Sequence, residues 1–388
     1  MELIKILHCA DFHFDTPFSE LTGSMGEKRK EDLRETFGRT VQLARQEKVQ
    51  LLLLCGDLFD NQGVSRMTIN YLINKFKEIP EVYIFIAPGN HDPYHEKSYY
   101  HLVDWPDNVH IFQNTWEKVE LEDLNVCVYG RGFTKPHYQE SFLKGFSVDD
   151  PTKLNIMLLH GDVVTPGQGS DYHPITTEEI GASGLDYLAL GHRHSCTEVT
   201  KQGCTSWAYS GCPEGRGFDE LGEKGILLGE LSKESCQLSF KSIAKRKYFE
   251  LKIDISNCRT YEEIVARVLE HTEGMEPGKN LFKVMLQGEL QEDFSLRTSV
   301  LCEKLEEKFY FLKIKDETIT KVDPQLLAAD FTLRGLFTKK MLERIEQASE
   351  QSGGQIREQV SGQTERKKGE LALKYGLRIL EQGEAGIE

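Results

Sequence analysis

Six short apolar runs, each ending in polar residues, dominate the first 240 residues of this 388-residue chain. The runs are LIKILHCAD, VQLLLLCGD, VYIFIAPGN, NVCVYGRG, LNIMLLHGD and LDYLALGHRH. Continuous apolar runs of this length suit strands that are buried on both faces. Helical stretches at residues 28–48 and 65–77 stand between them. The pattern predicts an α/β sandwich flanked by helices, with functional groups at the strand ends, where ligands usually bind in α/β folds.

Two later runs predict a hairpin that closes this first region. Residues 224–232 and 235–243 are both strand-like, and only two residues separate them. A second pattern then begins near Tyr248 and runs in the order strand, helix, strand, helix, strand. Its segments are 248–256, 260–274, 280–290, 296–309 and 309–319. This order over about 75 residues is typical of a small α+β domain, and it carries no obvious catalytic cluster.

The end of the chain has a different composition. Residues 330–347 and 371–381 are amphipathic, and the segment between them, 349–369, is polar and rich in Gly, Ser and Gln. Such helices can pack on their own domain, but two of them around a mobile linker favour docking to a partner. We therefore predict three regions, 1–240, 248–322 and 328–388, of which the last docks to a partner.

Composition limits the compartment and the mode of binding. The nine cysteines are scattered, without a CxxC pair, as expected in a reducing compartment. No run reaches the ~20 apolar residues of a membrane span, and the first residues lack the basic start of a signal peptide. We therefore expect a cytoplasmic protein. The net charge of −15 argues against binding nucleic acid through overall charge alone.

Five polar clusters follow the apolar runs. They are Asp11-Phe12-His13, Gly56-Asp57, Gly89-Asn90-His91-Asp92, His160-Gly161 and Gly191-His192-Arg193-His194. Residues two apart in an extended segment project to the same side, so Asp11 and His13 can hold one metal, and His192 and His194 can do likewise. Asp57 can bridge two cations. Imidazole, carboxylate and amide oxygen together suit Mn, Fe or Zn.

Each cluster alone is weak evidence for a metal site, because a single Asp-x-His or a Gly-Asp dipeptide more often has a structural role. The Gly-Asn-His-Asp sequence is stronger, since a turn needs Gly and Asn but not the His-Asp that follows. Five such clusters in this order, all at the ends of buried strands, indicate a dinuclear metal site.

These motifs resemble those of the calcineurin-like metallophosphoesterases over roughly the first 210 residues. HCADFH near residue 10, GDLFDN at 56–61 and PGNHD at 88–92 make the chain similar, within that superfamily, to the SbcD-type subunits of DNA-repair exonucleases. In that family a small capping domain follows the phosphoesterase domain, and terminal helices bind the coiled-coil base of an SMC-like ATPase. Residues 1–240 would then be the phosphoesterase domain and 248–322 the capping domain.

The resemblance also implies roles for single residues. One metal would be held by Asp11, His13, Asp57 and His194, and the second by Asp57, Asn90, His160 and His192, with Asp57 bridging. The catalytic residues would be His91, which contacts the scissile phosphate or protonates the leaving oxygen, and Asp92, which orients His91. Two divalent ions per chain, with manganese as the family's usual activator, would supply a shared hydroxide that attacks in line.

Two arginines are further candidates. Arg193, between two of the metal ligands, and Arg66, after the second cluster, can each reach a phosphate, although Arg66 is equally well explained as a solvated residue at a helix start. Of the remaining histidines, we expect His8 to be packed or hydrogen-bonded within the first strand. His173 is a loop residue for which a structural role outweighs a contact with substrate.

We therefore predict a hydrolase: a manganese-dependent DNA nuclease, exonuclease or endonuclease, that works in DNA repair with an SbcC-type ATPase. A homodimer is a further candidate assembly. The main alternative is a phosphoesterase that acts on nucleotides or other small phosphoesters with the same site. The third is a catalytically silent scaffold that presents its helices to a partner, although the complete ligand set argues against it.

Overall fold

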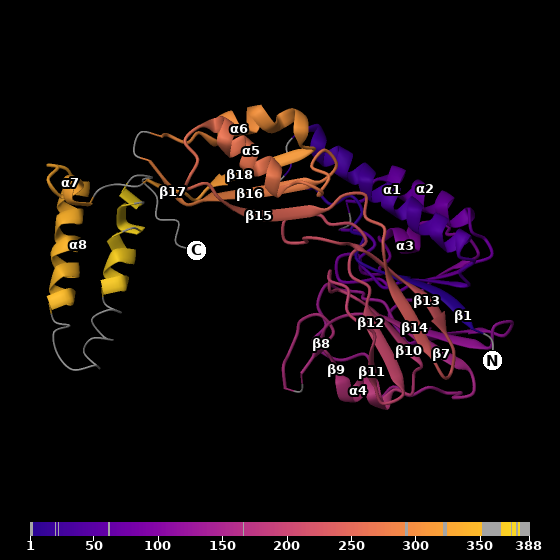
Figure 1. Ribbon diagram of the computed structural model, residues 1–388. Coiled ribbons are helices and arrows are strands. Elements are labelled where there is room, and N and C mark those ends of the chain that lie inside the picture. The colour runs from indigo at the N-terminus through magenta and orange to yellow at the C-terminus, as the bar shows by residue number, and fades with distance from the viewer. Residues whose placement is uncertain are drawn as a thin grey trace. The chain divides into compact units, whose positions relative to one another are not determined.

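The computed structural model describes residues 3–19, 21, 23–60, 63–165, 167–291, 294–320, 324–350, 366–373, 375–377 and 379–380. The chain divides into two compact units, Met1–Phe249 and Glu250–Glu388, and each unit is described by itself (Figure 1). Among the described helices, none is long and apolar enough to cross a membrane.

One sheet of the first unit has its strands in the order β14-β13-β1-β2-β3-β4. The strands are β1 (Ile4–Cys9), β2 (Leu51–Leu54), β3 (Tyr83–Ile86), β4 (Val109–Ile111), β13 (Gly225–Leu231) and β14 (Cys236–Ser242). Strands β1 to β4 are parallel, whereas β13 runs antiparallel to β1. The predicted hairpin is confirmed as the antiparallel pair of β13 and β14.

The other large sheet of this unit has the order β11-β12-β10-β7-β6-β5. Its strands are β5 (Glu117–Leu121), β6 (Val126–Gly130), β7 (Leu154–His160), β10 (Tyr187–Gly191), β11 (Thr200–Gln202) and β12 (Thr205–Tyr209). The four inner strands, β12, β10, β7 and β6, are parallel to one another. Short strands β8 (Val163–Val164) and β9 (Ile175–Thr176) pair separately. All six apolar runs form strands, namely β1, β2, β3, β6, β7 and β10. Within each sheet these strands are parallel, so their carboxyl ends lie at the same edge.

The two sheets pack face to face around one core. Ile6, Leu53 and Phe85 of the first sheet are buried in the same cluster as Val128 and Ile156 of the second. This burial on both faces explains why the strands are apolar throughout. The predicted sandwich is therefore confirmed.

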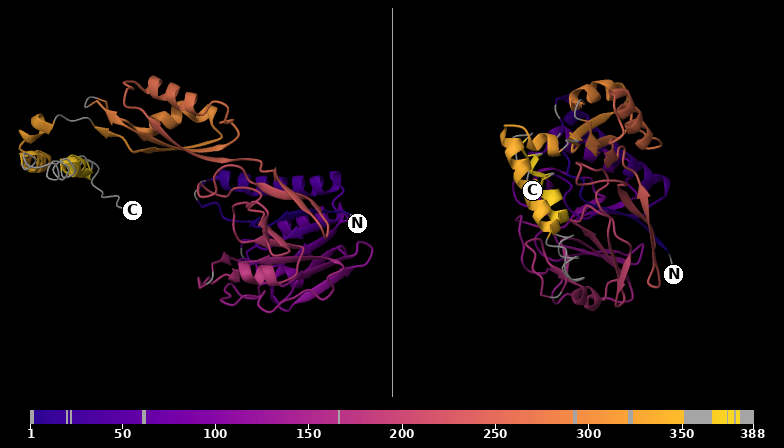
Figure 2. Two further views of the ribbon diagram at one scale, coloured as in Figure 1. Left: turned by 60° about the horizontal axis from the view of Figure 1, so that its bottom comes forward. Right: turned by 60° about the vertical axis from the view of Figure 1, so that its left-hand side comes forward.

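Helices cover the outer faces of the sandwich. Helices α1 (Ser24–Gln46) and α2 (Arg66–Lys77) lie together on one side of the unit (Figures 1 and 2). Between them, Phe37 and Phe76 are fully buried and in ring contact. Helix α4 (Thr177–Ala182) packs on the second sheet through the buried Ile180. A short helix, α3 (Tyr99–Leu102), follows β3.

The second unit contains the predicted alternation of strands and helices. Its elements are β15 (Tyr248–Asp254), which begins in the first unit, α5 (Tyr261–His271), β16 (Leu281–Gln287), β17 (Glu289–Leu290), α6 (Thr298–Leu305), a 3₁₀ turn (Glu306–Lys308), β18 (Phe311–Asp316) and β19 (Ile319–Thr320). Strands β15, β16 and β18 form one sheet, in which β16 and β18 are parallel. The end of the predicted region 248–322 lies outside the described residues.

The terminal helices pack on each other, which the sequence had not indicated. Helix α7 (Pro324–Ala328) precedes α8 (Leu333–Glu350), and the described residues of 366–380 are helical. A Cβ atom on Gly376 would lie 2.2 Å from Phe337, and one on Gly369 would lie 2.7 Å from Ile345. These two contacts define a close antiparallel pair, side by side in Figures 1 and 2. Most of the predicted linker 349–369 lies outside the described residues.

Pairing covers only part of the apolar surface of these helices. Leu373 and Leu377 are buried. The large apolar side chains that are exposed among the described residues of this segment are Leu326, Phe331, Leu333, Leu336, Leu371, Tyr375 and Ile379. We call Leu333, Leu336, Leu371, Tyr375 and Ile379 the apolar face of the terminal hairpin.

Candidate metal centre

The polar clusters lie at the carboxyl ends of neighbouring parallel strands. Asp11 and His13 follow β1, Asp57 follows β2, Asn90 follows β3, His160 ends β7, and His192 and His194 follow β10. Adjacent parallel strands end at the same edge of a sheet, and the two sheets face each other. The side chains therefore converge from both sheets on one place.

The backbone at these positions is not extended, contrary to our expectation for Asp11 and His13. Their φ angles are 56° and 48°, that of Asp57 is 49°, and that of His192 is 103°. Residues other than glycine rarely adopt such angles, and the cost is about 1–3 kcal/mol each. Backbone hydrogen bonds hold the turns, from Asp11 N to Gly56 O (3.0 Å) and from His13 N to Asp57 O (2.9 Å). The core thus imposes strained turns that aim the side chains inward.

Three histidines of the centre each have one ring nitrogen fixed by an oxygen. His13 Nδ1 lies 3.2 Å from Asp60 Oδ1, His160 Nδ1 lies 2.9 Å from Cys55 O, and His194 Nδ1 lies 2.7 Å from Glu220 Oε1. A proton on Nδ1 that is held in this way leaves the Nε2 lone pair available. This arrangement is usual for histidines that bind metals.

The Nε2 atoms of the same histidines meet other candidate ligands. His13 Nε2 lies 3.3 Å from His194 Nε2 and 3.6 Å from Asp57 Oδ2. His160 Nε2 lies 3.3 Å from Asp57 Oδ2 and 3.0 Å from Asn90 Oδ1. Asp57 therefore stands between a site on the side of His13 and a site on the side of His160.

Three groups of potential metal ligands overlap here. Asp11, His13 and His194 form one group, Asp11, Asp57 and His160 form the second, and His13, Asp60 and His91 form the third, with ligand atoms within 4.8 Å of one another in each. Opposed imidazole nitrogens and buried carboxylates with no bound cation would repel or compete for protons, so this donor set fits divalent ions. The residues present therefore suit the metals that the sequence predicted.

His192 and His194 do not share one group, contrary to the expectation from their spacing. His192 faces the other way: its ring centroid lies 5.2 Å from that of His160, and its Nε2 lies 3.5 Å from Asp162 Oδ2. Its backbone N–H donates to Asp11 Oδ1 at 3.1 Å. His192 is thus on the His160 side of Asp57, and His194 is on the His13 side.

Among the described residues, Asp92 makes no hydrogen bond or ion pair with His91, so its orienting role stays a prediction that no direct side-chain contact supports. Its buried carboxylate instead accepts hydrogen bonds from Gly89 N (2.7 Å), Phe59 N (3.0 Å), Asp57 N (3.2 Å) and Tyr100 Oη (2.6 Å). Asp92 therefore ties together the loops after β2 and β3. Burial, and then the neighbouring charge of Asp57, raise the pKa of Asp92 to about 6.

Asp60 takes the place beside His91 that we had assigned to Asp92. His91 Nδ1 lies 3.0 Å from the backbone O of Asp60 and 3.6 Å from its Oδ1. The His91 side chain is 46% exposed, and its ring centroid lies 4.7 Å from that of His13. His91 thus borders the metal centre while remaining open to a substrate.

Four residues of the centre escaped the sequence reasoning. They are Asp60, Asp162, Arg216 and Glu220. Asp60 lies three residues after Asp57, and Asp162 two after His160, so proximity in the chain was a usable signal. Arg216 Nη2 lies 3.1 Å from His194 Nδ1 and 2.8 Å from Glu220 Oε1. No local pattern marks this pair, because a long chain segment separates it from the clusters after β1 to β3.

The two arginine candidates have different surroundings. Arg193 is exposed, donates from Nη2 to Val163 O at 2.9 Å and lies over the Tyr209 ring at 5.3 Å. Arg66 is exposed at the start of α2 and makes no hydrogen bond or ion pair with any described residue.

Two other histidines are structural. His8 is buried between Tyr187 Oη (2.9 Å) and Leu190 O (3.1 Å), which confirms its expected role. His173 is fully buried and donates from Nδ1 to His160 O at 2.8 Å, so it supports the end of β7.

Comparisons with known proteins agree with this centre. Residues 4–196 match the family model of the calcineurin-like phosphoesterases. The uncharacterized metallophosphoesterase YhaO of Bacillus subtilis is 27% identical over 66% of this chain, a match that spans 64% of that protein's own length. The DNA double-strand break repair protein Mre11 of Saccharolobus solfataricus is 26% identical over 83% of this chain and 84% of its own.

Among solved structures, a dimetal phosphatase from Danio rerio is similar with a TM-score of 0.38 and 12% identity, over 58% of this chain and 91% of that one. The family match covers the strands of the two sheets from β1 to β10 and all five polar clusters of the centre. Through residues 4–196, the chain belongs to the calcineurin-like phosphoesterase family.

Proposed function

We propose that the chain is a metal-dependent phosphodiesterase that cleaves DNA with two divalent ions, manganese being the expected activator. The observation that carries this proposal is the convergence of three histidine Nε2 atoms on either side of Asp57. Asp11, His13, Asp57 and His194 would hold one ion. Asp57, Asn90, His160 and His192 would hold the other.

When bound, the ions would lower the pKa of a shared water and neutralise phosphate oxygens. The protein's own residues do the rest. His91 would protonate the leaving oxygen or bind the scissile phosphate from its half-open position, with its ring oriented by the backbone carbonyl of Asp60. Asp92 would act indirectly, by keeping the loops of Asp57 and His91 in register.

A polyanionic substrate is supported by cations that lie on aromatic rings beside the centre. Arg131 lies 4.0 Å from the Phe142 centroid, and Lys135 lies 4.8 Å from the Tyr138 centroid. Phe142 in turn stacks at 4.1 Å on His173, which hydrogen-bonds the backbone of His160. These residues belong to one segment, 131–142, which follows β6 and carries two cationic side chains that a phosphate backbone could pair with.

The partners follow from the relatives and from the terminal hairpin. One relative carries the name of a DNA double-strand break repair protein, which supports DNA as substrate and a role in repair. Two paired helices that leave an apolar face uncovered support docking of an SbcC-type, SMC-like ATPase there. The second unit would be the capping domain. We further propose a cytoplasmic location and leave a homodimer as a candidate assembly.

The alternatives use the same residues. A phosphoesterase for nucleotides or other small esters would need the centre but neither the second unit nor the hairpin. A silent scaffold would not need the strained turns at Asp11, His13 and Asp57, because strain of this kind persists where a site requires it.

A parallel assay distinguishes these functions. The full chain is incubated with manganese and end-labelled duplex DNA, single-stranded DNA, cyclic nucleotides or bis-p-nitrophenyl phosphate, with Asp57→Asn as the inactive control. Cleavage of DNA supports the nuclease. Hydrolysis of cyclic nucleotides without cleavage of DNA supports the small-ester enzyme. If none of the substrates is hydrolysed, whether or not the protein binds manganese, the result supports the scaffold.

A further inference from the structure

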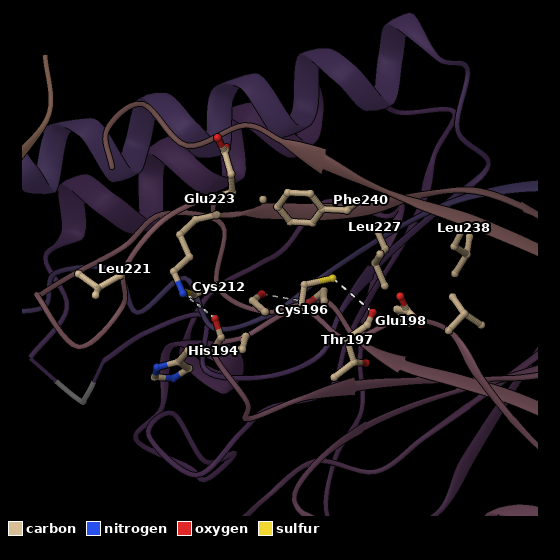
Figure 3. Close-up of a pocket in the computed structure, with 16 residues that line it drawn as sticks. His194, Cys196, Thr197, Glu198, Cys212, Leu221, Glu223, Leu227, Leu238 and Phe240 are labelled. Atoms are coloured by element: carbon tan, nitrogen blue, oxygen red, sulfur yellow. Dashed lines mark hydrogen bonds between the residues drawn. The ribbon is translucent and has the colours of Figure 1, made fainter. Parts of the chain in front are cut away.

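A cavity of about 570 Å³ is lined in part by His194, one of the residues of the metal centre. The β13–β14 hairpin gives it an apolar wall of Leu227, Leu238 and Phe240, and the segment after His194 forms the opposite wall (Figure 3). The volume falls within the range of small-molecule sites, which are mostly apolar with a few placed polar groups.

One buried cation lines this cavity. Lys224 is only 7% exposed, and its Nζ donates to His194 O at 3.0 Å. Across the described ranges, no carboxylate lies within ion-pair distance of this ammonium, which carries three donors. Two carboxylates also line the cavity. Glu223 turns its carboxylate to Ser242 Oγ and Lys247 Nζ, and Glu198 is exposed to solvent.

An ammonium without a counter-ion is costly to bury, so its presence in a cavity indicates an anion that binds there. The aromatic and aliphatic wall indicates an apolar body attached to that anion. Phe240 and Leu221 are 37% and 44% exposed, which leaves their apolar surfaces open to such a ligand.

We propose that this cavity binds a small amphipathic anion. Its carboxylate, sulfonate or phosphate group pairs with Lys224, and its planar or branched apolar body rests on Leu227, Leu238 and Phe240. The site does not depend on the nuclease assignment. Its ligand is either a nucleotide of the substrate next to the cleaved bond or a separate small molecule, since both offer this chemistry.

The test uses 8-anilinonaphthalene-1-sulfonate, a planar apolar anion whose fluorescence rises on binding, with the full-length protein. We expect a saturable site that Lys224→Met weakens roughly ten- to a hundredfold, as loss of a charge-assisted hydrogen bond does. Phe240→Ser should also weaken it. The matched control is Lys241→Met, which removes an exposed lysine of β14 outside the cavity. Probe bound at the terminal hairpin is insensitive to all three changes.

Probe binding that both Lys224→Met and Phe240→Ser leave unchanged overturns the proposal. If Lys224→Met lacks a cooperative thermal transition, Phe240→Ser on the edge strand decides alone. A short oligonucleotide, added without metal, then separates the two sources. Displacement of the probe assigns the cavity to the substrate strand, and retention assigns it to a separate small anion. Failure to cleave DNA would refute the nuclease proposal and leave this result unaffected.

Discussion

The carboxylate of Glu220 lies 2.7 Å from Nδ1 of His194 and is buried. Burial raises the pKa of Glu220, but hydrogen bonds from His194 and Arg216 outweigh it and hold the pKa well below its ordinary value. The carboxylate therefore stays charged and fixes the His194 proton on Nδ1. His194 thus presents Nε2 to the centre in a fixed orientation, because a residue with no role in the sequence motifs holds it there.

Glu220→Gln should therefore weaken metal binding while the fold persists. Carboxylates that orient a ligating histidine typically contribute ~10–100-fold to metal affinity. We expect the manganese concentration for half-maximal hydrolysis of bis-p-nitrophenyl phosphate to rise by about this factor, with activity restored at high manganese. Glu178→Gln, which changes an exposed carboxylate of α4, is the control. An unchanged manganese requirement would show that Glu220 only supports the loop.

Asp57→Asn should abolish activity and most metal binding. Asp57 lies between His13 and His160, so its charge would offset both ions, and a neutral amide cannot do so. Elemental analysis of the dialysed protein measures the metal content, with the exposed Asp171→Asn as control. Two ions per chain in Asp57→Asn would exclude the bridging role.

His91→Ala should slow turnover and leave the metal content close to that of the wild type. General acid catalysis contributes typically ~10²–10⁴ in rate, and His91 borders the centre with a half-exposed side chain. The rate is measured with DNA and with a chromogenic diester. Loss of the metals along with activity would make His91 a ligand and contradict the role assigned to it.

His8 should make the fold sensitive to acid. Burial lowers its pKa to about 3, although its hydrogen bond to the Leu190 carbonyl opposes this shift. The unfolded chain, with a histidine pKa near 6.5, therefore binds a proton that the folded chain does not. The free energy of unfolding then falls as pH decreases from about 6.5 to about 3, by ~1.4 kcal/mol per pH unit from this residue.

Urea unfolding of His8→Gln between pH 7 and pH 4 checks this sign. The variant should be less stable at pH 7, because it loses the contact to Tyr187, and its stability should vary less with pH. His271→Gln, on the exposed surface of α5, should keep the wild-type slope. An equal slope in His8→Gln would mean that His8 is protonated in the folded state.

Removal of the chain after Val322 should leave metal content and diester hydrolysis nearly unchanged. The centre is built from the first unit alone. The same truncation should abolish association with an SMC-like ATPase and any ATP-stimulated digestion of long DNA. Because α8 and the last helix already cover each other in part, Leu371→Ser with Tyr375→Ser is a milder variant that alters only the exposed apolar face. A loss of solubility or of the thermal transition on truncation would instead show that the hairpin completes the second unit.

The sequence by itself determined which segments form strands and which polar cluster follows each strand. It also determined that the centre contains carboxylate, imidazole and amide side chains. Continuous apolar runs can be satisfied only by burial on both faces, so the strands were readable without any knowledge of their neighbours. The hairpin at residues 224–243 and the alternation after Tyr248 were readable for a similar reason, since short-range patterns set them. The positions of Asp11, Asp57 and His160 at strand ends were predictable, because each directly follows or ends such a run.

The tertiary structure decided which residues support these donors. Asp92 holds loops together, Asp60 stands beside His91, and Glu220 fixes His194. Left-handed turns, rather than extended alternation, bring Asp11 and His13 together. The terminal helices meet at Gly369 and Gly376. Apart from the proximity of Asp60 to Asp57 in the chain, these relationships have no local signature, because each depends on a contact that forms only when the sheets, loops or helices of the folded chain have packed together.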